Sequence, residues 1–98
     1  MKTWKNASNS DLKLFDQISI LLHSNSHLID FMFDQHCPKL RVPVEDLLRQ
    51  TQGMCPSDQV LVKLSIDFWC GQGGCLVNEL FDYKDFIFPK LVQALYDF

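Results

Sequence analysis

The stretch WCGQGGC, residues 69–75, places two cysteines and three glycines within seven positions. Two further cysteines, Cys37 and Cys55, each precede a proline, and Cys70 precedes a glycine. Because thiolates that bind zinc must converge from tight turns, Cys37, Cys55, Cys70 and Cys75 form one candidate structural zinc site. The spacing opposes it, since the chain contains no C-x-x-C pair. We favour the interpretation that these cysteines are small apolar core residues and that the protein has no cofactor, with zinc as the alternative.

A redox role for Cys70 and Cys75 has weaker support. Reactive pairs typically occur as C-x-x-C at a helix N-terminus, where the helix dipole lowers the pKa of the thiol. Cys70 is instead predicted at the C-terminus of a helix, where the dipole raises the pKa. The glycines between the two cysteines still allow a disulfide to close under oxidation.

Segment 68–79 matches part of a calcium-binding loop. Counted from Phe68, glycine falls at position 6 and glutamate at position 12, as in an EF-hand loop. Positions 1, 3 and 5 are Phe, Cys and Gln, so the carboxylate ligands that calcium needs are missing. We therefore expect an EF-hand-like but ligand-poor loop without a metal, acting as a hinge between two helices. Its structural residues are Gly71, Gly73 and Gly74.

Motifs for catalysis are missing from the sequence. There is no nucleophile elbow, phosphate-binding P-loop or dinucleotide fingerprint. His23 and His27 are four residues apart, but Ser-Asn-Ser between them favours a turn over a continuous helix. We therefore expect no enzyme and no catalytic residues, and keep a small enzyme as a less favoured alternative.

Nucleic-acid binding is also disfavoured. The formal net charge is −3, and the basic residues Lys39, Arg41 and Arg49 are interrupted by acids. A helix-turn-helix drawn through residues 43–70 would use the most apolar helix of the chain for recognition, although such a helix belongs in a core. We expect no nucleic-acid partner, and a DNA-binding helical domain remains a less favoured alternative.

The composition is that of a small globular protein. The 98 residues are 47% hydrophobic and 21% charged, which suits a single domain. No apolar run approaches the roughly 20 residues that span a bilayer, and the first residues do not resemble a signal peptide. We expect no membrane partner, a cytoplasmic location and free thiols, since that compartment is reducing.

Apolar residues recur at helical spacing along most of the chain, which predicts an all-α bundle of about five helices. The segment after residue 57 is apolar on nearly all sides, with only Gln59, Lys63 and Asp67 as a polar stripe, so it should be the central buried helix. We predict a flexible tail at 1–9 and a helical domain at 10–98. The expected helices are 11–23 with Ser10 as N-cap, 27–36, 43–52 closed by Gly53, 58–70, a short turn at 76–81, and a final segment from Asp82 to about Tyr96. Pro89 costs this last helix one early hydrogen bond if Asp85 is its N-cap, and should kink it if the helix begins at Asp82.

Twelve aromatic and three methionine side chains are many for a chain of this size. Because one small core cannot hold them all, an excess on the surface indicates a protein-binding patch. We predict a small intracellular, non-catalytic protein that acts as an adaptor, inhibitor or accessory subunit, with a homodimer among the candidate assemblies. The predicted partner-binding residues are Phe31, Met32, Phe33, Phe86 and Phe88.

Overall fold

A computed structural model describes Trp4 and residues 7–96. Within these residues it contains six α-helices and two short 3-10 helices, and the only strand-like feature is an isolated bridge between Phe33 and Leu40. The all-α prediction is confirmed, and the turn after the glycine loop is a helix of its own. The elements are α1 (Asn9–Leu21), η1 (His23–Asn25), α2 (His27–Met32), α3 (Val44–Gln50), η2 (Thr51–Gly53), α4 (Pro56–Cys70), α5 (Val77–Asp82) and α6 (Lys84–Tyr96).

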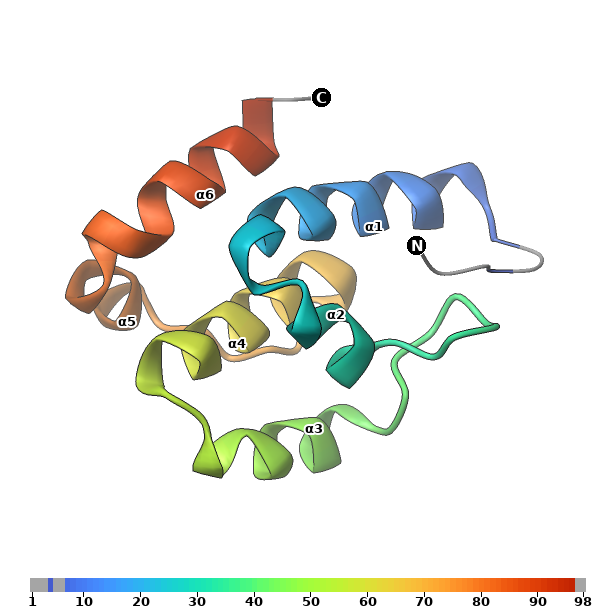
Figure 1. Cartoon of the computed structure of the whole chain (residues 1–98), viewed down its shortest axis with the longest axis horizontal. Helices are drawn as coiled ribbons and strands as arrows, with labels where there is room; N and C mark the ends of the chain where they lie inside the picture. Colours follow the sequence, from blue (N-terminus) through green and yellow to red (C-terminus); the bar gives the residue numbers. More distant parts are fainter. Residues whose placement is uncertain (1–3, 5–6, 97–98) are drawn as a thin grey trace.

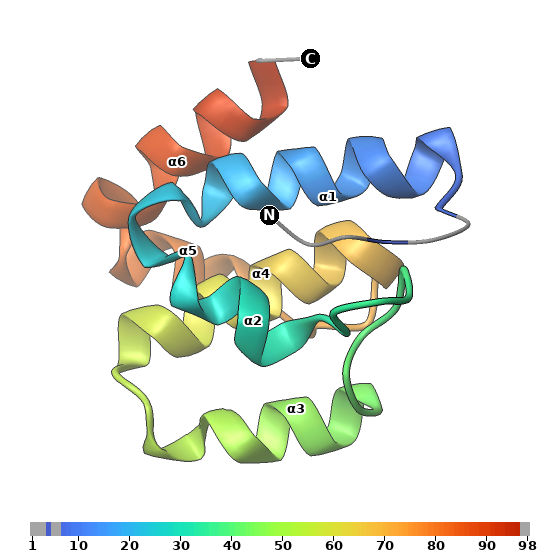
Figure 2. The same cartoon turned by 45° about the vertical axis from the view of Figure 1, so that its right-hand side comes forward.

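The helices pack around α4. In two views α6 and α3 lie on opposite sides of the molecule, with α1, α2 and α4 between them (Figures 1 and 2). Helix α1 contacts both α4 and α6, α3 contacts α4, and α5 contacts α6. None of the described helices has the length and apolar character needed to cross a bilayer.

Helix α4 is the central element, as its composition predicts. Six of its residues are buried, and the five apolar ones share one hydrophobic core with residues of α1, α2, α3 and α6. Two polar residues are buried among the described residues, Ser65 of α4 and Thr51 of η2. Both find backbone acceptors, because Ser65 Oγ donates to the Leu61 carbonyl and Thr51 Oγ1 to the Leu48 carbonyl. The buried α4 residues are Val60, Leu61, Val62, Leu64, Ser65 and Ile66.

The N-terminal segment differs from the predicted tail. Helix α1 begins at Asn9, with Ser8 rather than Ser10 as its N-cap. The Ser8 hydroxyl accepts from the Asp11 N–H, and the Asp11 carboxylate accepts from the Ser8 N–H. Ser10 has a lysine three residues later and cannot form this reciprocal capping box. Trp4 packs against the core, so residues 1–9 are not uniformly a tail; positions 1–3 and 5–6 lie outside the described residues.

Helix α2 ends four residues earlier than predicted. After Met32 the chain turns extended at Phe33, and the Arg41 N–H donates to the Met32 carbonyl. The Asp34 carboxylate accepts from the N–H groups of His36 and Cys37, which replaces a further helical turn by a local side-chain cap.

The remaining helix ends follow local capping chemistry. Helix α3 runs into the 3-10 turn η2, so Gly53 lies inside that turn and does not have the positive φ of a helix-closing glycine. Helix α4 begins at Pro56, and Gly71 closes it in the left-handed conformation with φ 75°. Helix α6 starts at Lys84 and continues through Pro89, which removes one backbone donor.

Candidate functional site

Two of the five predicted partner-binding residues are core residues. Met32 and Phe33 have essentially no exposed surface and belong to the hydrophobic core, where the Phe33 ring contacts Phe15 of α1 and Trp69 of α4. Phe31 is half-buried, and the Arg41 guanidinium lies 5.6 Å from its ring centroid while donating to the Phe31 carbonyl. These three side chains are therefore not a free apolar surface. Phe86 and Phe88 are exposed, as predicted.

A continuous apolar stripe lies on the outer side of α6. Phe88, Val92 and Leu95 follow at intervals of four and three residues, so they share one helix face, and their side chains are 38%, 52% and 53% exposed. Phe81 of α5 is 61% exposed, and its ring centroid lies 6.3 Å from that of Phe88. We call Phe81, Phe88, Val92 and Leu95 the α5–α6 face.

The neighbouring face of α6 packs onto the core. Ile87 and Ala94 are fully buried, and Leu91 between them is half-buried. Helix α6 thus carries two apolar stripes shifted by one residue, of which only one is covered. From sequence either stripe could face the core, so Val92 and Leu95 could be recognised as apolar but not as surface residues.

The glycine loop is organised by a carboxylate. Asp67 of α4 accepts hydrogen bonds from the N–H groups of Gly73, Gly74 and Cys75 at 2.7, 3.2 and 3.0 Å. The helix–loop–helix arrangement expected for segment 68–79 is present, but the loop turns N–H donors inward. The loop is a backbone anion nest filled by the chain's own Asp67. A calcium loop does the opposite, because it turns oxygen atoms inward to bind a cation.

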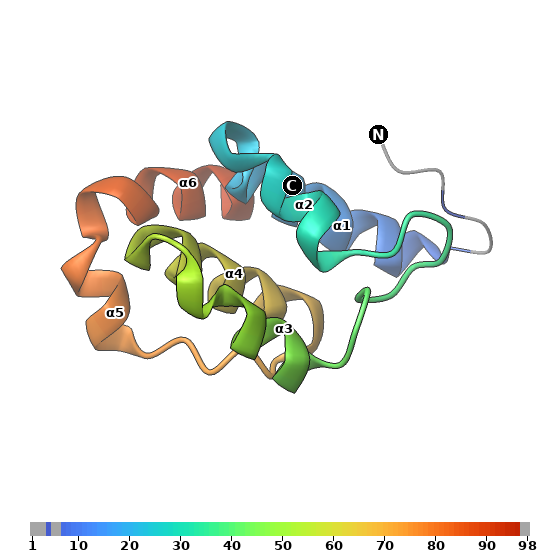
Figure 3. The same ribbon diagram turned by 60° about the horizontal axis from the view of Figure 1, so that its bottom comes forward.

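Close packing explains the buried glycine of this loop. A Cβ atom on Gly73 would overlap the Lys63 carbonyl oxygen and approach the Asp67 N–H group. Gly74 adopts φ 68°, a left-handed conformation that side chains disfavour. Figure 3 shows the loop running back alongside α4 before it reaches α5. The predicted hinge is therefore a loop held firmly against α4.

The polar stripe of α4 is used entirely to hold neighbouring segments. Lys63 Nζ lies 2.8 Å from a Glu79 carboxylate oxygen, and Glu79 also accepts from the Leu76 N–H. The hydrogen bond from Lys63 is the main cause that lowers the pKa of Glu79 below its ordinary value. Gln59 Nε2 donates to the Met54 carbonyl. Gln59, Lys63 and Asp67 thus tie α4 to the segments before and after it.

The cysteines are not core residues, contrary to the favoured interpretation. Cys37, Cys55 and Cys70 are exposed and Cys75 is half-buried, all as free thiols. They lie at helix ends and turns, where proline and glycine force the chain to the surface. Burial, followed by the charges of Glu79 and Asp67, raises the pKa of Cys75 to about 11. Among the described residues, no three His, Cys, Asp or Glu side chains are grouped so as to hold a metal ion.

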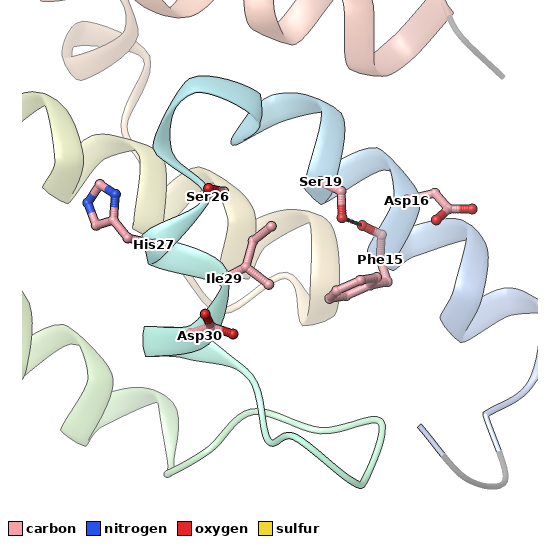
Figure 4. Close-up of a pocket in the computed structure, with 7 residues that line it drawn as sticks. All are labelled: Phe15, Asp16, Ser19, Ser26, His27, Ile29 and Asp30. Carbon is pink, nitrogen blue, oxygen red and sulfur yellow. Dashed lines mark hydrogen bonds between the residues drawn. The ribbon is translucent and has the colours of Figure 1, made fainter. Parts of the chain in front are cut away.

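A pocket of about 460 Å³ lies between α1 and α2 (Figure 4). Phe15 and Ile29 point into it, whereas Asp16 and His27 point away at opposite ends. His27 Nε2 lies 3.9 Å from a carboxylate oxygen of Asp58, outside the pocket. The polar groups do not converge on a common point, so the pocket lacks the arrangement of a nucleophile and a base. Its lining residues are Phe15, Asp16, Ser19, Ser26, His27, Ile29 and Asp30.

Two of the basic residues weighed for nucleic-acid binding are engaged within the protein. Besides its contacts with Phe31, Arg41 donates to the Gln50 side chain at 2.8 Å. Arg49 pairs with Asp46 at 3.2 Å. Arg41 and Arg49 thus already make hydrogen bonds or an ion pair within the protein.

Four aromatic rings meet where the N-terminal segment contacts the body. We call Trp4, Phe15, Phe33 and Trp69 the aromatic cluster; they come from the N-terminal segment, α1, the residue after α2, and α4. Trp4 lies with its ring centroid 4.5 Å from that of Phe15 and 5.7 Å from those of Phe33 and Trp69. Its indole N–H donates to the Asp34 carbonyl at 2.8 Å. Trp4 belongs to the segment predicted as a tail, because no local sequence pattern indicates a contact with Asp34, 30 positions away.

The α5–α6 face is thus an exposed apolar surface, whereas the rings of the aromatic cluster are buried or half-buried. Comparison of the chain with protein-family models, with curated protein sequences and with solved structures finds no match in any of the three.

Proposed function

We propose that this protein works by protein–protein contact through the α5–α6 face, without a catalytic step, and that a second copy of the chain occupies this face. The supporting observation is the exposure of four large apolar side chains on adjoining helices. Removing such side chains from water contributes about 25 cal/mol per Å² of apolar surface. A cluster of this kind is typical of interaction sites rather than of a monomer's surface.

The pattern of the face is self-complementary. Val92 lies four residues after Phe88 and three before Leu95. If two α6 helices pack antiparallel about a two-fold axis at Val92, each Phe88 meets the other copy's Leu95. The same patch then serves both copies, which is the requirement of an isologous dimer.

Charges beside the stripe favour this pairing. Lys84 and Asp85 precede Phe88 by four and three residues, so they lie next to it on the helix surface. Their opposite signs leave no net charge along this edge, and two identical faces approach each other without repulsion.

The concentration dependence of mass tests the proposal. We expect the wild-type chain to change from monomer to dimer with concentration in sedimentation equilibrium. Val92→Asp should weaken the dimer at least about 100-fold, since it places two unpaired carboxylates at the axis. Gln93→Asp is the matched control, because it adds the same charge to the exposed neighbouring position and should leave the dimer intact.

Two outcomes would contradict the proposal. One is a wild-type chain that stays monomeric at every concentration. The other is a Val92→Asp variant that dimerises as strongly as Gln93→Asp. Far-UV circular dichroism of both variants confirms that a lost dimer does not reflect a lost fold.

We further propose that the protein works in a reducing compartment, the cytoplasm. Supporting this location are the free, exposed thiols of Cys37, Cys55 and Cys70. In an oxidising compartment such thiols would form disulfides. Localisation of the chain in its host by an epitope tag tests this proposal, and retrieval from a secreted fraction contradicts it.

A further inference from the structure

The aromatic cluster has a receptor part that is complete without Trp4. Phe15 and Phe33 contact each other with centroids 5.4 Å apart, and Phe33 and Trp69 with centroids 5.1 Å apart. Both pairs are close to perpendicular, an arrangement that aromatic rings favour. Because these rings belong to α1, α4 and the residue after α2, the packing of the body alone sets their positions.

The hydrogen-bond acceptor of the site is also fixed by the body. Asp34 donates its N–H to the Lys39 carbonyl at 3.0 Å, and its carboxylate accepts from the N–H groups of His36 and Cys37. These bonds hold the backbone on both sides of Asp34, whose carbonyl accepts from the Trp4 indole N–H. An aromatic wall with one fixed acceptor suits an indole ring better than a phenyl ring, which has no N–H group to donate.

The ligand and the receptor lie in different parts of the chain. Trp4 precedes Ser8, the extended N-cap of α1, by four residues, whereas every receptor group lies between residues 15 and 69. Covalent linkage sets the effective concentration of Trp4 at the site but adds no contact to it. The same contacts are therefore available to an identical segment from another molecule, as in exchange of an element between protomers.

We infer that Phe15, Phe33, Trp69 and the Asp34 carbonyl form a tryptophan-binding site that Trp4 fills within its own chain and that Trp4 of a second copy can fill in its place. The chemical class of ligand is an indole side chain carried on a peptide. The site lies on other elements than the α5–α6 face, so it does not depend on the proposed dimer.

Binding in trans tests this inference. The receptor is the full chain with Trp4→Ala, and the probe is a fluorescein-labelled peptide of residues 1–8, MKTWKNAS. We expect saturable binding by fluorescence anisotropy, and at least tenfold weaker binding to the wild-type chain, whose own Trp4 competes. The peptide with alanine in place of Trp4 should not bind. A naphthylalanine peptide, which lacks the indole N–H, should bind about 2- to 10-fold more weakly.

Several results would overturn the inference. One is that the tryptophan peptide does not bind a folded Trp4→Ala chain. Another is that it binds the wild-type chain as tightly as the Trp4→Ala chain. A third is that the alanine peptide binds as tightly as the tryptophan peptide. If Trp4→Ala loses its helical circular dichroism, Trp4→Phe serves as receptor, and failure of the tryptophan peptide to bind it counts against the inference. N-acetyltryptophanamide tests a free indole ligand; binding as tight as that of the peptide would overturn the role of a second copy.

Discussion

At the scale of single residues, Gly73 is the one of the four glycines where an added Cβ would meet neighbouring atoms. It is buried against the backbone of α4, where a Cβ would overlap the Lys63 carbonyl oxygen. Of the three hydrogen bonds to the Asp67 carboxylate, the one donated by the Gly73 N–H is the shortest. Any side chain here pushes the loop away from α4 and loosens the anion nest.

We predict that Gly73→Ala lowers the free energy of unfolding by about 2–4 kcal/mol, because the loop must shift and lose hydrogen bonds to Asp67. Gly53→Ala is the matched control: it has no neighbour within 4 Å and no positive φ, so it should be neutral or up to about 1 kcal/mol stabilising. Cys70→Ser, at an exposed position, should change stability by less than about 0.5 kcal/mol. Urea unfolding measures all three. If Cys70→Ser is less stable than Gly73→Ala, the result supports the alternative that the cysteines bind a metal.

At the scale of elements, the loop and α5 are joined to α4 by charged groups. Lys63 and Glu79 have side chains only 28% and 27% exposed, so their ion pair is partly shielded from solvent. The Leu76 N–H adds a second hydrogen bond to Glu79. This contact decides where α5 begins and sets the approach of the chain to the α5–α6 face.

We predict that Glu79→Gln lowers the free energy of unfolding by about 1 kcal/mol at pH 7. The pKa of Glu79 is lowered in the folded state, so its contribution is complete above the unfolded value near 4.5 and is lost as pH falls through the folded value. The wild-type and variant stabilities should therefore converge below pH 4.5. Urea unfolding across pH 2.5–7 measures this, with Asp16→Asn at an exposed position as the matched carboxylate-to-amide control. A difference that stays constant with pH would contradict the ion pair as its cause.

At the scale of the whole molecule, α6 has two apolar stripes with different tasks. Ile87 and Ala94 attach the helix to the core, whereas Phe88, Val92 and Leu95 remain exposed. If the proposed dimer forms through the exposed stripe, stability and association depend on adjacent faces of one helix, and substitutions can separate them.

We predict that Ile87→Ala destabilises the monomer by about 2–5 kcal/mol, the usual cost of a cavity in a core. Val92→Ala, half-exposed on the other stripe, should change the unfolding free energy by less than about 0.5 kcal/mol in dilute protein. Thermal unfolding at protein concentrations below the dissociation constant of the dimer measures the effect of both substitutions. Equal destabilisation by the two substitutions would mean that both stripes are buried in the monomer.

Much of the helical framework was predictable because its determinants are local. Apolar spacing of three and four residues identifies each helix, and the nearly all-apolar surface of α4 identifies the central one. Boundaries were less accurate, as at α1 and α2, because the capping carboxylates of Asp11 and Asp34 compete with neighbouring caps of similar strength.

By itself the sequence determined that this chain forms helices and that α4 is buried. Only the tertiary structure decided which aromatic side chains are exposed, that the cysteines lie outside the core, and that Trp4 binds the body. The physical reason is the sequence separation of the contacts involved. Helix formation depends on neighbours within four residues, whereas burial depends on which face of an element distant in sequence packs against the residue. Phe33 and Phe88 have the same chemistry, and only the presence of α1 and α4 around one and not the other makes the first a core residue and the second part of the α5–α6 face.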